Sequence, residues 1–223
     1  MIASSIATIS EISGGRAILG LGAGDKITLA NLGIERKKPL TGMRESIEII
    51  RRLWNEGIVE YNGDVFKLPK ARLNFKVKYK PLIYMAAQGP KMSQLAAEIA
   101  DGVLINASHP RDYEQAKENF KIGLQKRDPK RKKFDVCAYC SFSIHDNPQK
   151  AENAAKIVVA FIVAGSIPPI LERHGIPLEQ AKNLEELLKK GKFKKAMEAV
   201  TPEMLDSFCI AGTPQQCIQK IET

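Results

Sequence analysis

The sequence predicts an α/β protein built on a parallel sheet, and three observations support this fold class. Short apolar segments with strand character alternate with longer segments whose apolar residues recur every three or four positions. Such alternation requires crossover connections and therefore parallel strands. The 223 residues are 44% apolar and 26% charged, which is typical of a globular protein with a substantial core. A glycine-rich turn directly after the first strand, in ILGLGAGD, is typical of the ligand-binding end of such a sheet.

The first elements are marked by clear periodicity and clear stops. Apolar residues keep helical spacing from Ile2 to Ile12, before two glycines that end the helix. An apolar strand follows from Ala17 to Gly22, and a short helix begins near Lys26. The segment from Thr41 to Asn55 is strongly amphipathic and predicts a longer helix. Next, Asn62-Gly63-Asp64 lies between two segments of strand character and predicts a hairpin turn.

The remaining elements continue the alternation of strand and helix. Their strands are expected at Leu82–Ala87, Gly102–Asn106 and Phe134–Ile144, and their helices at Met92–Ala100, Arg111–Lys126 and Gln149–Val163.

Residues 167–206 interrupt this alternation with short charged helices around several prolines. In a parallel barrel such an insertion often covers the ligand end, although it can also be surface decoration. The chain closes on a helix with Thr213 as its N-cap and Pro214 in the first helical position. We expect residues 1–223 to form a single domain that contains the helical insertion 167–206.

Two segments carry a resemblance to a known family. The first is SSIATISEISGGRAILGLGAGDK, followed by RESIEIIRRLW (Arg44 to Trp54), and the second is AAQGPKMSQLAAEIADGVLINAS (Ala86 to Ser108). Both are similar to the bacterial-luciferase-like superfamily of flavin and deazaflavin enzymes. More narrowly, they resemble the archaeal methylenetetrahydromethanopterin reductases that use coenzyme F420. The resemblance extends over most of the chain and is weakest from about Ile167 to Asp206.

The resemblance implies a (β/α)8 TIM barrel and an oxidoreductase of the methanogenesis one-carbon pathway. The reaction implied is hydride transfer from reduced F420 to 5,10-methylenetetrahydromethanopterin. About four core strands are found in the sequence, so the expected fold is a partial luciferase-like barrel without the first three strands and the last strand of the family pattern. Open sheet edges would then need another chain, or the sequence is a fragment of a longer protein, which we favour. We accordingly expect these residues alone to have little or no activity.

The turn after the first strand is the main candidate site. The resemblance implies that Ala23, Gly24, Asp25 and Thr28 line the deazaflavin. Asp25 would then be the catalytic candidate, as a hydrogen-bond partner of cofactor or substrate or as a proton donor. The alternative is that Asp25 only caps the short helix that begins near Lys26.

A second turn joins a strand to a helix through Gln88, Gly89, Pro90, Lys91 and Met92. A helix N-terminus offers free N–H groups and the positive end of the helix dipole, which suit a phosphate. By resemblance, this turn holds the phosphate-bearing tail of the cofactor. The alternative is an ordinary connection between a strand and a helix.

A third strand ends in Asn106 and Ala107. The Asn106 amide can both donate and accept hydrogen bonds, and the resemblance implies that both residues face the cofactor. Three successive strand ends with small, polar or acidic residues meet at one rim of a parallel sheet. This convergence predicts a ligand site independently of the resemblance.

Other cofactors and functions were weighed against F420. The glycines alternate as GxGxG and lack the helix-facing third glycine of a dinucleotide fold, which disfavours a Rossmann site. Among enzymes, the alternative is an FMN-dependent luciferase-like monooxygenase. Outside enzymes, it is a non-catalytic shortened barrel that binds flavin or serves as an oligomeric structural protein. We also expect a homo-oligomer for the reductase.

The net charge of +9 is concentrated in two regions, Lys117–Lys133 and Lys182–Lys195. These regions are either solvated helix faces or attract an acidic ligand, which suits an anionic cofactor and an anionic pterin substrate. Aromatic residues make up only 6% of the chain and no nucleic-acid motif is present, so nucleic acid is not an expected partner. No apolar run reaches the length of a membrane span and no signal peptide is recognised, which predicts a cytoplasmic protein.

The four cysteines do not predict a metal site. Cys137 and Cys140 form CAYC inside an expected strand, where residues three apart point to opposite faces. Zinc sites instead gather both thiolates on one ion. Cys209 and Cys217 lack this spacing, and the histidines are scattered. We expect no metal and free thiols in a reducing cytoplasm.

Overall fold

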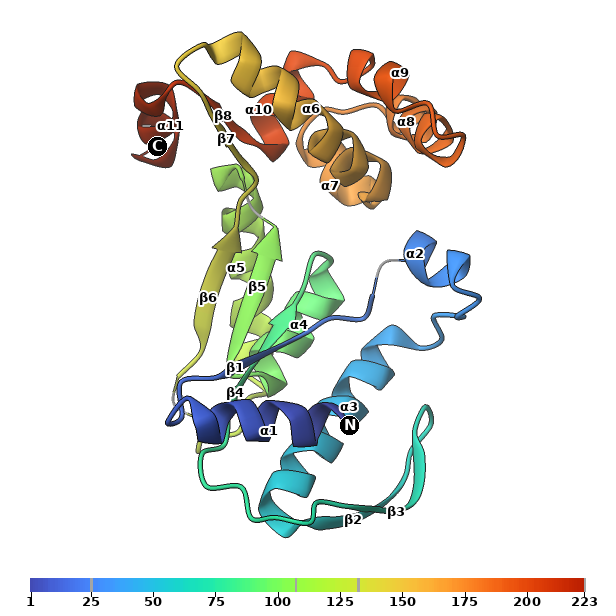
Figure 1. Ribbon diagram of the computed structural model, residues 1–223, viewed down its shortest axis with the longest axis vertical. Helices are drawn as coiled ribbons and strands as arrows, with labels where there is room; N and C mark the ends of the chain where they lie inside the picture. The colour runs from blue at the N-terminus through green and yellow to red at the C-terminus, as the bar shows by residue number, and fades with distance from the viewer. Residues whose placement is uncertain (25, 107, 132, 223) are drawn as a thin grey trace. The chain divides into compact units, whose positions relative to one another are not determined.

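The computed structural model describes residues 1–24, 26–106, 108–131 and 133–222. The chain divides into two compact units (Figure 1). The first contains residues 1–105 and 116–137, and the second contains residues 106–115 and 138–223.

A parallel sheet forms the centre of the first unit, as the sequence predicts. Its strand order is β1-β4-β5-β6, with β1 parallel to β4 and β4 parallel to β5. Ile18 pairs with Leu82, and Ala86 pairs with Leu104. The four strands are β1 (Ile18–Leu21), β4 (Leu82–Ala86), β5 (Gly102–Asn106) and β6 (Asp135–Tyr139).

One face of this sheet is buried, and the other is partly open. The side chains of Ile83, Met85 and Val103 are fully buried, whereas Ile18 and Leu82 on the opposite face are each 50% exposed. Because parallel strands normally carry cover on both faces, the open face distinguishes this sheet from a complete barrel. The helices of the first unit are α1 (Ile2–Ile12), α2 (Lys26–Asn31), α3 (Pro39–Glu56), α4 (Pro90–Ile99) and most of α5 (Pro110–Leu124).

An antiparallel hairpin of β2 (Ile58–Asn62) and β3 (Lys67–Arg72) follows α3, as the turn signal predicts. The buried side chain of Glu45 fixes this hairpin to α3. Its carboxylate accepts hydrogen bonds from the backbone N–H groups of Asp64 (2.7 Å), Val65 (3.0 Å) and Phe66 (2.8 Å).

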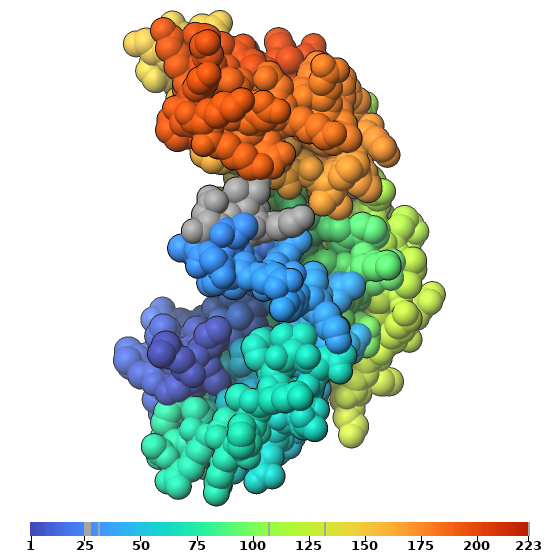
Figure 2. Space-filling model, turned by 90° about the vertical axis from the view of Figure 1, so that its right-hand side faces the viewer, coloured from blue at the N-terminus to red at the C-terminus, as the bar shows by residue number. Residues whose placement is uncertain are grey.

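The second unit combines a short parallel pair of strands, β7 (Phe142–Ile144) and β8 (Ile210–Gly212), with a helical core around α6. Helices α8, α9 and α10 pack against α6. The orange atoms of this unit form one continuous surface in Figure 2. Its helices are α6 (Pro148–Gly165), α7 (Pro168–Arg173), α8 (Leu178–Lys189), α9 (Phe193–Glu198), α10 (Pro202–Phe208) and α11 (Pro214–Glu222).

The single strand predicted for Phe134–Ile144 is wrong. β6 ends at Tyr139, and β7 belongs to a different sheet. The break occurs because Ser141 leaves the first ladder: its carbonyl accepts the N–H of Ile210 at 2.8 Å. The predicted N-cap at Thr213 is confirmed by a hydrogen bond from the Gln216 N–H to Thr213 Oγ1 at 3.3 Å. None of the described helices has both the length and the apolarity needed to cross a bilayer.

Candidate functional site

The carboxyl ends of β1 and β4 lie side by side, because the two strands are parallel and in register. A Cβ built on Gly22, just after β1, would stand 3.3 Å from the Cβ of Ala86 at the end of β4. The N–H of Ala87 donates to the carbonyl of Leu104 on β5 at 3.0 Å, which keeps the neighbouring strand ends together. This edge of the sheet therefore presents nearly bare backbone, which a flat ligand can approach closely.

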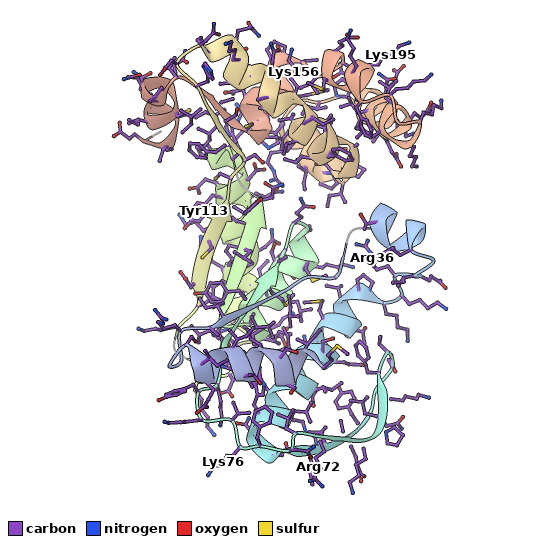
Figure 3. The ribbon with its side chains drawn as sticks, in the orientation of Figure 1. Arg36, Arg72, Lys76, Tyr113, Lys156 and Lys195 are labelled. Carbon is purple, nitrogen blue, oxygen red and sulfur yellow. The ribbon has the colours of Figure 1, made fainter. Side chains whose placement is uncertain are left out.

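The turn after β1 requires glycine at position 24. Gly24 has φ +79°, and a Cβ there would lie 2.7 Å from Leu29 Cδ1. Its carbonyl accepts a hydrogen bond from Arg36 Nη1 at 2.9 Å, so an exposed arginine from the α2–α3 connection fixes the turn (Figure 3). Arg36 was not predicted, because it lies in a run of charged residues without a spacing signal. Ala23 is half-buried beside it.

The predicted catalytic residue Asp25 lies outside the described residues, as does Ala107. Their predicted roles stay predictions. Thr28 lies in α2 and is exposed. Among the other described candidates, Lys91 is the one with an ionisable side chain.

The turn after β4 forms the N-terminus of α4. Gly89 is the N-cap, with extended backbone, and no described side chain caps the helix. Pro90 occupies the first helical position, where its missing N–H costs nothing. The first backbone bond of the helix runs from the N–H of Ser93 to Gly89, which leaves the preceding N–H groups outside the helical ladder. In this turn Gln88, Pro90 and Lys91 are exposed, and Gly89 and Met92 are half-buried.

Asn106 is the last residue of β5, half-buried, and is grouped with the second unit. The structure thus brings the first two predicted turns to one edge of the sheet within the first unit. Small residues line one part of this edge, and a helix N-terminus with a lysine lies at the other. The arrangement fits a flat ring system that carries an anionic tail.

A buried polar cluster in the second unit was not predicted. Asp112 in the first turn of α5 is 6% exposed. Its Oδ1 accepts a hydrogen bond from Arg173 Nη1 at 2.5 Å and lies 2.9 Å from His174 Nε2. Burial lowers the pKa of the neighbouring His109, and the charge of His174 lowers it further. The partners lie about sixty residues apart in sequence, at separations of 61 and 62, so no local pattern could reveal them.

Comparison with known proteins places the chain among close relatives. The model of the luciferase-like monooxygenase family matches residues 1–223. The chain is 53% identical over 225 residues to the 5,10-methylenetetrahydromethanopterin reductase of Archaeoglobus fulgidus, covering 99% of this chain and 68% of that protein. It is 49% identical over 222 residues to the reductase of the same name from Methanolobus tindarius, covering 98% of this chain and 67% of that protein.

Solved structures of F420-dependent enzymes also match this chain. The coenzyme F420-dependent tetrahydromethanopterin reductase from Methanopyrus kandleri matches with a TM-score of 0.82 and 41% identity, over 99% of this chain and 68% of that one. An F420-dependent secondary alcohol dehydrogenase matches with a TM-score of 0.74 over 99% of this chain and 64% of that one. At 20% identity, this second likeness concerns the fold alone.

Proposed function

The chain belongs to the luciferase-like monooxygenase family and, within it, to the 5,10-methylenetetrahydromethanopterin reductases, and on this premise we propose that it transfers hydride from reduced coenzyme F420 to 5,10-methylenetetrahydromethanopterin. The observation that carries the proposal is the identity of 53% across 99% of the chain. The protein is an oxidoreductase, and F420 is its cofactor. The relatives at 53% and 49% identity are methylenetetrahydromethanopterin reductases, which disfavours the alternative of an FMN-dependent monooxygenase.

The carboxyl edge of the sheet fits this cofactor. F420 supplies the hydride chemistry, and the chain supplies binding and orientation. Gly22, Ala23 and Gly24 have no bulky side chains of their own, which would leave room for the flat deazaflavin. Arg36 holds the Gly24 carbonyl and thereby the shape of the turn.

The phosphate-bearing tail of F420 is proposed to bind at the N-terminus of α4, which no described side chain caps. Its backbone N–H groups and the Lys91 ammonium would receive the negative charge. Gln88, Gly89, Pro90 and Met92 form the rest of this turn.

The other assignments in the proposal rest on the resemblance. Asp25 would hold a hydrogen bond to cofactor or substrate or donate a proton, and Thr28, Asn106 and Ala107 would contact the cofactor. The pterin substrate follows from the reductase identity.

We also propose that the protein forms a homo-oligomer and is cytoplasmic. Four free cysteines support a reducing compartment. The half-exposed Ile18 and Leu82 on the open sheet face support association with another chain. Light scattering of the purified chain tests this part: a monomer at all concentrations would contradict it.

The test of the cofactor assignment is calorimetric titration of the chain with F420 and with FMN. Binding tests the proposal without requiring turnover. We expect F420 to bind at least about tenfold more tightly than FMN, and Lys91→Gln to weaken F420 binding by about threefold to tenfold through loss of one charge-assisted contact. Lys70→Gln, an exposed lysine on β3, is the matched control and should leave the affinity unchanged. Equal or tighter binding of FMN would refute the F420 assignment.

A further inference from the structure

A cavity of about 980 Å³ lies in the first unit, at the amino-terminal ends of the parallel strands. Leu82 begins β4, Asp101 precedes β5, and Asp135 begins β6, and all three line the cavity. It therefore lies at the end of the strands opposite the turns proposed to hold F420. In parallel α/β folds this end normally serves stability rather than ligand binding.

Positive charge dominates the walls of this cavity. Among the described residues that line it, six have cationic side chains and three have carboxylates: Arg51, Lys80, Arg127, Lys130, Arg131 and Lys133 against Asp101, Asp128 and Asp135. We call this group the basic cavity.

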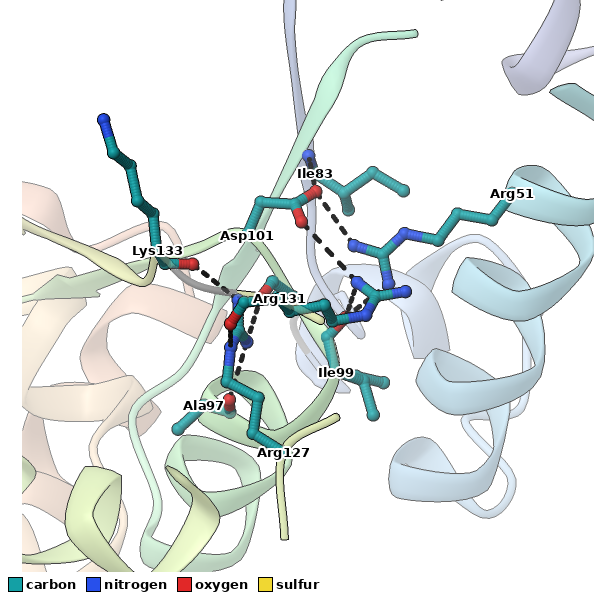
Figure 4. Close-up of polar contacts among 9 residues, drawn as sticks. Arg51, Ile83, Ala97, Ile99, Asp101, Arg127, Arg131 and Lys133 are labelled. Carbon is teal, nitrogen blue, oxygen red and sulfur yellow. Dashed lines mark hydrogen bonds and ion pairs between the residues drawn. The ribbon is translucent and has the colours of Figure 1, made fainter. Parts of the chain in front are cut away.

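The carboxylate of Asp101 is shared by two of the arginines (Figure 4). Its Oδ2 lies 2.8 Å from Arg51 Nη2, and its Oδ1 lies 3.5 Å from Arg131 Nη1. Oδ2 also accepts the backbone N–H of Ile83 at 2.9 Å. Asp135 accepts the hydroxyl of Tyr84 at 2.5 Å, a contact that, with burial, raises the pKa of Tyr84 to about 12. These two carboxylates thus already have donors of their own.

Arg127 is held by main-chain carbonyls rather than by a carboxylate. It donates to the carbonyls of Ala97 (2.8 Å) and Ala100 (2.6 Å) at the end of α4, and to that of Lys133 (2.6 Å). Its Nε also donates to the carbonyl of Arg131 at 2.9 Å, so the guanidinium is rigidly placed by carbonyl acceptors. Burial lowers the pKa of both Arg51 and Arg127, and repulsion by Arg131 lowers each further.

We propose that the basic cavity is a binding site for a phosphate group, free or on a small phosphate ester. The guanidinium groups of Arg51 and Arg131, which share the Asp101 carboxylate, and that of Arg127 repel one another, and an oxyanion among them would relieve this repulsion. Guanidinium groups also match the oxygen geometry of phosphate through paired hydrogen bonds. The exposed Lys130 and Lys133 also line the cavity and add positive charge. The competing explanation is a purely structural clamp on the C-terminus of α4, and the inference does not depend on the proposed function.

The test is thermal unfolding of the chain in inorganic phosphate and in sodium chloride of equal ionic strength. We expect phosphate to raise the Tm and chloride to leave it nearly unchanged, since ligands that bind only the folded state stabilise it. Lys130→Gln should weaken phosphate binding by about threefold and Arg131→Gln by about tenfold. Lys130→Gln removes an exposed side chain, so it tests the site even if Arg131→Gln does not fold.

Two controls separate this site from others. Lys70→Gln changes the net charge equally on an exposed strand and should retain the phosphate effect. Lys91→Gln alters the N-terminus of α4; loss of the effect there would place the phosphate at the proposed F420 site and overturn the inference. No rise in Tm, or a rise insensitive to Lys130→Gln and Arg131→Gln, would leave only the structural clamp. Adenosine monophosphate, tested alongside phosphate, shows by tighter or weaker binding whether the site prefers an ester or the free ion.

Discussion

At the scale of single residues, the candidate site depends on positions that carry no side chain. Gly22 and Gly24 add no side chains to the edge of the sheet, and the positive φ of +79° favours glycine at position 24. Arg36 contributes by donating a hydrogen bond to the carbonyl of Gly24. The chemistry of the turn is therefore set by backbone shape.

Gly24→Ala should weaken F420 binding by about tenfold and lower stability by about 1–2 kcal/mol. The added methyl group both strains a positive φ and meets Leu29. Gly33→Ala is the matched control, because Gly33 has φ +70° but nothing within 4 Å of its Cβ position. Calorimetry and chemical denaturation measure the two effects. Equal losses of F420 affinity in both variants would show that the contact with Leu29 is irrelevant.

At the scale of elements, buried carboxylates connect segments that lie far apart in sequence. Glu45 joins α3 to the turn of the β2–β3 hairpin, and Asp112 joins the first turn of α5 to the end of α7. In both cases one carboxylate satisfies several donors that would otherwise be buried without partners.

Glu45→Gln should lower the Tm by a few degrees at pH 7, and the difference should shrink as the pH falls. Burial alone would raise the pKa of Glu45, but the N–H groups of Phe66, Asp64 and Val65 outweigh it and lower the pKa below its ordinary value of 4.5. A lowered folded-state pKa contributes stability above the ordinary value, and this is lost as the pH falls through the folded-state pKa. Glu60→Gln, on the exposed side of β2, should show no such pH dependence.

Asp112→Asn should destabilise the second unit by about 2–3 kcal/mol, because it leaves the half-buried Arg173 without its counter-charge. Limited proteolysis should then cut earlier within α7 and its flanking loops. Glu118→Gln is the control on the same helix, since its ion pair with Lys121 is exposed. Unchanged proteolysis in Asp112→Asn would mean that the cluster contributes little to holding α7.

At the scale of the whole molecule, periodic segments were predictable and long-range contacts were not. Helix α1 and strand β5 have the predicted bounds because glycines and apolar repeats mark their ends. The break after β6 was missed because FDVCAYCSFSI contains no glycine or proline, and a contact with Ile210 creates it. Strand β8 was missed because three residues between helices carry no periodicity.

The candidate site divides in the same way. The turns after β1 and β4 were predicted, since glycine patterns at strand ends are local signals. The Asp112 cluster and the basic cavity were not, because their members come from distant segments that only the fold brings together.

The central claim is that F420 binds at the carboxyl edge of the β1-β4-β5-β6 sheet. Hydrogen–deuterium exchange with and without F420 tests it most directly. We predict slower exchange in peptides that contain Gly22–Gly24 and Lys91–Ser93, and unchanged exchange in those that contain Arg127–Arg131. Protection confined to Arg127–Arg131, or the absence of protection at both turns under saturating F420, would contradict the claim.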